Sequence, residues 1–92
     1  MSVEPVVPAE VETAVRSAQE LPPGEAALCL AAICRRAAIA LHQIARSESE
    51  ARRGQPDWAA WAKLHNASRD AVVRTTALRD AASALTARTD SA

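Results

Sequence analysis

Aromatic side chains are almost missing from this chain. There is no phenylalanine and no tyrosine, and the two tryptophans, Trp58 and Trp61, lie within one helical turn of each other. Valine, isoleucine and threonine are too few and too scattered to build strands, because sheets favour β-branched and aromatic residues. Alanine, in contrast, makes up about a quarter of the 92 residues, and it is the strongest helix former. The composition therefore predicts an all-α protein.

The sequence also lacks an excess of either charge and any long apolar run. Eleven basic and eleven acidic residues give zero formal net charge, so the whole molecule has no field that attracts nucleic acid or anionic lipid. No apolar run approaches the roughly 20 residues that cross a bilayer. The N-terminus, MSVEPVVPAE, has neither the basic start nor the apolar core of a signal peptide. We expect a cytoplasmic protein that does not bind membranes. Its preference for arginine over lysine is typical of a GC-rich bacterial genome.

Sequence motifs for catalysis and metal binding are missing as well. The only cysteines, Cys29 and Cys34, are five residues apart, which separates them by about 140° around a helix and prevents a disulfide within it. There is no cysteine or histidine spacing of a zinc site, no Glu-x-x-His pair and no glycine-rich phosphate loop. We expect no enzymatic activity, no cofactor and no metal, and we interpret both cysteines as small buried residues.

The few prolines and glycines divide the chain into three predicted helices. Pro8 suits the first position of a helix, and Pro22-Pro23-Gly24 ends that helix. Gly54, with a proline two residues later, is typical of a helix end with a left-handed glycine. The chain is expected to form one domain, residues 1–92, with helices at about 8–21, 25–53 and 56–88 and flexible ends at 1–7 and 89–92.

Hydrophobic periodicity predicts how the two long helices pack. The third helix carries a heptad pattern typical of coiled coils, with Trp61, Leu64, Ser68, Ala71, Thr75, Leu78, Ala82 and Leu85 at the a and d positions. The second helix has one broad apolar face, formed by Leu30, Ile33, Cys34, Ala37, Ala40, Leu41 and Ile44. Because the two helices are of similar length and a short turn joins them, we expect an antiparallel hairpin.

A hairpin of this length buries too little apolar surface to be stable alone. We therefore expect a homodimer, in which two hairpins pair into a four-helix bundle flanked by the short N-terminal helices. The alternative architecture is a monomeric three-helix bundle.

The candidate binding residues fall into two groups. Trp58, Trp61 and His65 form a surface for a protein partner or a flat ligand, because tryptophan is enriched at binding hot spots. Arg35, Arg46 and Arg53 share a polar stripe of the second helix, which suits phosphate groups but is interrupted by glutamates. His42 lies on that polar side, so no close pair with His65 is expected. Trp58, beside the turn, is expected to stack on Arg52 or Arg53.

These patterns favour a non-enzymatic helical interaction protein that acts as an accessory, adaptor or regulatory subunit and binds another protein. Two alternatives stay open. One is a nucleic-acid-associated regulator that uses the arginine stripe, and the other is a small-ligand sensor with a Trp/His pocket.

Overall fold

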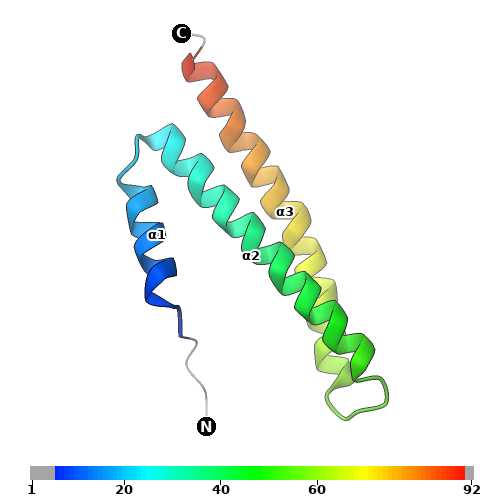
Figure 1. Ribbon diagram of the computed structural model, residues 1–92. Helices are drawn as coiled ribbons and strands as arrows, with labels where there is room; N and C mark the ends of the chain where they lie inside the picture. The colour runs from blue at the N-terminus through cyan, green and yellow to red at the C-terminus, as the bar shows by residue number, and fades with distance from the viewer. Residues whose placement is uncertain (1–5, 91–92) are drawn as a thin grey trace.

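Three helices account for most of the chain in the computed structural model, which describes residues 6–90 and their side chains up to residue 87 (Figure 1). Helix α1 spans Ala9–Gln19, α2 spans Pro23–Ala51 and α3 spans Trp58–Asp90. No residue between 6 and 90 lies in a strand. The all-α prediction is confirmed. Among these residues, no helix is both long enough and apolar enough to cross a membrane.

The helix ends lie close to the breaks in the sequence. Pro8 caps α1, and Pro23 begins α2 two residues earlier than expected, where its missing N–H needs no partner. Helix α3 begins at Trp58 and continues to Asp90, so part of the expected C-terminal tail is helical. Of the other residues for which flexible ends were predicted, 6 and 7 lie outside the helices, and 1–5 and 91–92 lie outside the described part of the chain.

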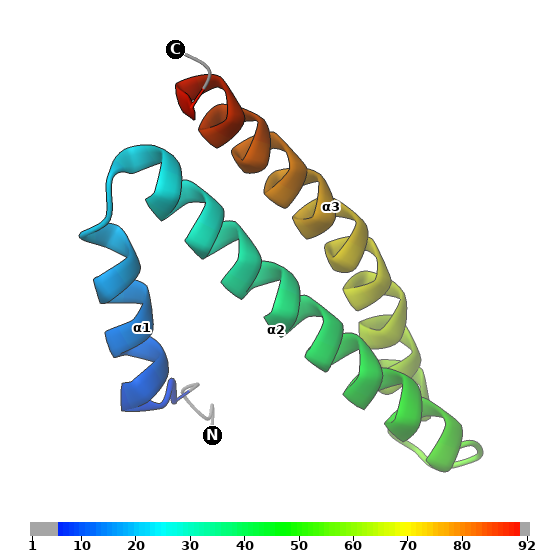
Figure 2. The ribbon, with the colours of Figure 1, turned by 45° about the horizontal axis from the view of Figure 1, so that its top comes forward.

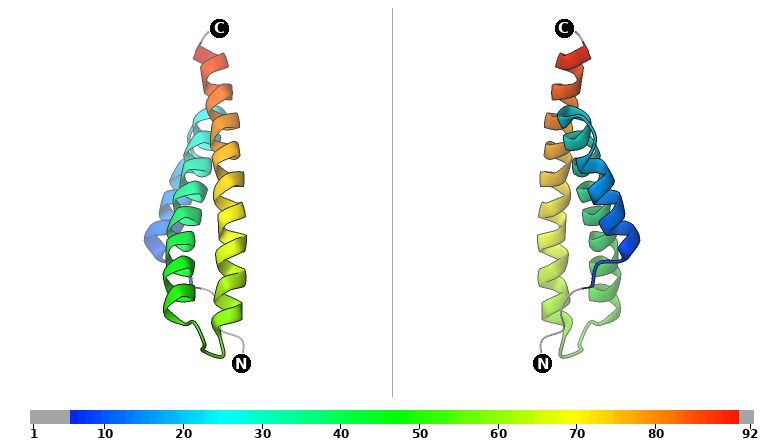
Figure 3. Two further views of the ribbon diagram at one scale, coloured as in Figure 1. Left: turned by 90° about the vertical axis from the view of Figure 1, so that its right-hand side faces the viewer. Right: turned by 90° about the vertical axis from the view of Figure 1, so that its left-hand side faces the viewer.

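Helices α2 and α3 form the predicted antiparallel hairpin. They lie side by side, and α3 extends beyond the start of α2 (Figures 2 and 3). Helix α1 turns back along α2, and within the described residues it makes no contact with α3. The chain therefore does not form a three-helix bundle on its own. It is an elongated slab with extents of 57 × 26 × 17 Å.

Small side chains form the contact between the helices. The buried apolar residues of the described chain are all alanines, namely Ala18, Ala31, Ala38, Ala45 and Ala82. On α2, alanines at positions 31, 38 and 45 recur every seven residues, which is the repeat of a helix that packs against one neighbour. The buried polar residues are Ser49 and Ser68. Because no buried residue among those described is larger than serine, the bulky apolar side chains must lie elsewhere.

Several bulky side chains of the two long helices are exposed, and this corrects the expected packing. Leu41 and Ile44, from the broad apolar face of α2, are 41% and 55% exposed. Ser68 and Ala82 are buried as the heptad predicted, but Leu78 and Leu85 are 55% and 53% exposed. The hairpin instead closes through the side of α2 that carries alanine, serine and histidine, where helices approach more closely. We call the exposed surface the apolar face; it consists of Leu30, Cys34, Leu41 and Ile44 of α2 with Leu78 and Leu85 of α3.

Candidate functional site

Two histidines meet inside the hairpin near its closed end. The rings of His42 in α2 and His65 in α3 stack with centroids 4.8 Å apart and planes inclined by 19°. Nδ1 of His42 lies 3.2 Å from Oγ of Ser68, whose hydroxyl donates to the His65 carbonyl at 2.9 Å. Because that hydroxyl proton is engaged, His42 Nδ1 is the donor to Ser68. The expectation that the two histidines stay apart was wrong, since the polar side of α2 is the side that faces α3.

Arg35 takes part in the same helix contact. Its Nε donates to Oγ1 of Thr76 at 3.1 Å, and the Thr76 hydroxyl donates to the Val72 carbonyl at 2.8 Å. The predicted stripe of three arginines is therefore divided. Arg35 joins α2 to α3, whereas Arg46 and Arg53 are exposed near the closed end.

Arg52 connects the two helices across the turn. Its guanidinium lies 2.6 Å from the Glu48 carboxylate and 2.8 Å from that of Asp57. The hydrogen bond that Arg52 donates to Glu48, followed by the charge of Asp57, raises the pKa of Arg52 above its ordinary value. The same guanidinium lies 5.5 Å from the ring centroid of Trp61, within cation–π range. The expected stacking thus involves Trp61 rather than Trp58.

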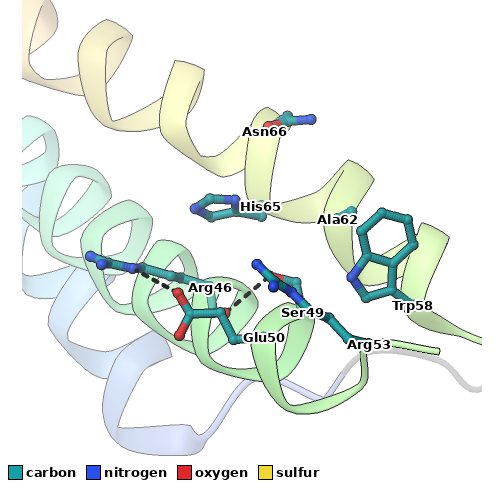
Figure 4. A pocket seen from close by; sticks show the side chains of 8 residues that line it. All are labelled: Arg46, Ser49, Glu50, Arg53, Trp58, Ala62, His65 and Asn66. Atoms are coloured by element: carbon teal, nitrogen blue, oxygen red, sulfur yellow. Dashed lines mark hydrogen bonds and ion pairs between the residues drawn. The ribbon is translucent and has the colours of Figure 1, made fainter. Parts of the chain in front are cut away.

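A cavity of about 220 Å³ opens between the last turns of α2 and the first turns of α3 (Figure 4). We call it the arginine cavity. It is lined by Arg46, Ser49, Glu50, Arg53, Trp58, Ala62, His65 and Asn66. Four of the six predicted binding residues therefore lie together, and the other two, Arg35 and Trp61, hold the helices together. Ala62 and Asn66 were not predicted, although their positions four and eight residues after Trp58 place them on the same side of α3.

The arginine cavity combines a flat apolar wall with positive charge. The indole of Trp58, 41% exposed, stands at one end, His65 at the other, and the Arg53 side chain points toward the space between them (Figure 4). Arg46 Nε lies 3.6 Å from a carboxylate oxygen of Glu50. No carboxylate of the described residues lies within ion-pair distance of Arg53. The cavity therefore offers one unpaired guanidinium.

An apolar groove of about 370 Å³ lies at the other end of the hairpin. It is lined by Ala27, Leu30, Ala31, Cys34, Leu78, Ala81, Ala82 and Leu85. Cys34 is exposed there, contrary to the expectation that both cysteines are buried, whereas Cys29 is half-buried. Leu41 and Arg53 are twelve residues apart, which places their side chains roughly 120° apart around the axis of α2. The side chain of the buried Ala45 leaves the axis in a direction between those of Leu41 and Arg53. The apolar face and the arginine cavity therefore open on different sides of the hairpin.

The described residues contain no group of three or more histidine, cysteine or acidic side chains that could hold a metal ion. Comparisons of the chain with protein families, curated proteins and solved structures give no significant match.

Proposed function

We propose that this protein is a non-enzymatic interaction protein that works as a homodimer, in which the apolar faces of two hairpins pack into a four-helix bundle. The main support is that small apolar side chains are buried within one chain, whereas large apolar side chains are exposed. Alanines fill the interior of one chain, while Leu41, Ile44, Leu78 and Leu85 are each at least 41% exposed. Large exposed apolar areas usually mark protein interaction sites.

The exposed area supports an interface of ordinary size. The chain has an accessible surface of 7187 Å², whereas a folded monomer of this mass typically exposes roughly 5,100 Å². A standard interface buries about 800 Å² of each partner, well within the difference. Since the slab is 17 Å in its shortest extent, two slabs stacked on their broad sides give four helices around a shared core.

The pattern of the apolar face favours a second copy as the partner. Along α2, Leu30, Cys34, Ala37, Leu41 and Ile44 alternate by four and three residues, which is the spacing that a helix needs to pack against another helix. These positions are uncharged, so two copies meet without repulsion between like charges. The face carries both large side chains and small ones, which lets it interdigitate with an identical face.

An accessory or regulatory role suits this architecture. The dimer occupies the apolar face and leaves the side with the arginine cavity open in both copies. The alternative of nucleic-acid binding is weaker, because the Arg35 side chain of the arginine stripe is hydrogen-bonded to Thr76. Arg46, moreover, is paired with Glu50.

Mass in solution tests the proposal. Light scattering or analytical ultracentrifugation of the full chain at micromolar concentration is expected to give twice the chain mass of 9.7 kDa. A mass equal to one chain, in a helical and monodisperse sample, rejects the dimer.

A further inference from the structure

We propose that the arginine cavity binds a compact aromatic carboxylate, one molecule per chain. Arg53 is the charge partner of the carboxylate, and the ring of the ligand lies against Trp58 and Ala62. This site is separate from the apolar face, so the inference goes beyond the proposed dimer and does not depend on it.

Charge selects an anion. The residues that line the cavity include two arginines and one glutamate, so their formal charge is positive although the whole chain is neutral. Glu50 lies beside Arg46 at 3.6 Å, which leaves Arg53 as the guanidinium without a carboxylate among the described residues. A guanidinium presents two parallel N–H groups that match the two oxygens of a carboxylate.

Shape selects a small planar ligand. The volume of about 220 Å³ is smaller than the roughly 300–1,000 Å³ typical of sites for drug-sized molecules. The Trp58 indole provides a flat surface on which a ring can stack. Ala62, one turn further along α3, extends only a methyl group and leaves space beside the indole. One ring with a short acidic group therefore fits the cavity better than a nucleotide does.

The walls of the cavity are partly fixed before any ligand binds. The His65 ring is stacked on His42 with centroids 4.8 Å apart. The Ser49 hydroxyl already donates to the Arg46 carbonyl at 3.0 Å, so toward a ligand it is an acceptor. Glu50 at the rim repels groups of high negative charge, which favours a monoanion over a polyphosphate. Such preorganisation reduces the entropy that is lost on binding.

Calorimetric titration of the full chain with three probes tests the proposal. Benzoate is expected to bind once per chain with a Kd of roughly 1 mM, as suits a ligand of so few atoms. Benzamide has the same shape without the charge, and inorganic phosphate has charge without the ring; each is expected to bind roughly tenfold more weakly or worse. Equal affinity for benzamide or for phosphate overturns the proposal, and so does the absence of saturable benzoate binding at tens of millimolar.

Variants locate the site. R53A and W58A are expected to weaken benzoate binding by roughly tenfold or more while the helical circular dichroism stays unchanged. R36A is the matched control, because Arg36 is an exposed arginine of α2 outside the cavity lining. Wild-type affinity in R53A, or an equal loss in R36A, contradicts the assignment. L78D, which changes the apolar face, is expected to retain benzoate binding, so a failed dimer and a failed ligand site give different results.

Discussion

The imidazole of His42 stacks on that of His65 across the hairpin, with 4.8 Å between ring centroids. Because each ring packs on the other, we expect the effects of H42A and H65A on the free energy of unfolding to be non-additive by about 0.5–1.5 kcal/mol. Urea unfolding at one fixed protein concentration measures this coupling. Q43A, at the exposed neighbouring position, serves as the control. Its combination with H65A should be additive, and additivity of the histidine pair would show that the stack contributes nothing.

Leu78 and Val73 give a matched test of the apolar face. Both are exposed on α3, at 55% and 67%, but five residues place them about 140° apart around the helix. L78D puts a charge into the proposed interface and is expected to give a helical monomer, because burying an unpaired charge opposes association. V73D should remain dimeric. Ultracentrifugation across a concentration series distinguishes the two, and dimerisation of L78D with wild-type affinity would move the interface elsewhere.

Ala45 tests how closely the helices approach. Its side chain is 0% exposed at the contact between α2 and α3, so a larger residue forces the helices apart. A45L is expected to lower the free energy of unfolding by about 1–3 kcal/mol. A77L makes the same change at an exposed position of α3 and should stay within about 0.5 kcal/mol of the wild type. Similar stability of the two variants would mean that the contact has free space.

The two glycines are expected to respond to alanine in opposite directions. Gly54 has φ +81°, a conformation that other L-residues adopt at a cost, so G54A should destabilise by about 1 kcal/mol. Gly24 lies inside α2, where a Cβ would meet only Thr86 Cγ2 at an ordinary 3.6 Å. G24A should stabilise by about 0.4–1 kcal/mol, because alanine restricts the unfolded chain. Thermal or urea unfolding measures both changes in stability. A loss of stability in G24A would show that the first turn of α2 requires glycine.

The three helices and their antiparallel pairing could be predicted from sequence because local chemistry sets them. Proline and glycine mark the breaks, and Gly54 adopts the left-handed conformation that its position indicated. The face of α2 that packs on α3 could not be predicted in this way. Hydrophobicity favours burial of Leu41 and Ile44, but periodicity does not distinguish a partner helix of the same chain from one of another copy. The alanines of α2 allow a closer contact, and that contact is the one within the hairpin.

The arginine cavity was only partly predictable for a related reason. Arg46 and Arg53 were assigned to one group, and Trp58 and His65 to another, because each group follows the period of its own helix. Their meeting depends on the relative rotation of α2 and α3, which arises from the packing of alanine, serine and histidine. The same rotation brings Arg52 over Trp61. Trp58, which is nearer the turn, therefore lines the cavity.

The alanines at 31, 38 and 45 have a consequence for how the hairpin is aligned. Since they repeat every seven residues, α2 slid by seven residues along α3 would again place alanine against the same surface. Arg35 and His42 are also seven residues apart, but their side chains differ in length and charge. Such a slide moves His42 to the place of Arg35 beside Thr76, or Arg35 to the place of His42 beside Ser68, and in either case the other side chain loses its partner. An arginine and a histidine inside a contact of small apolar residues thus select a single register, in the manner of polar residues that fix the alignment of coiled coils.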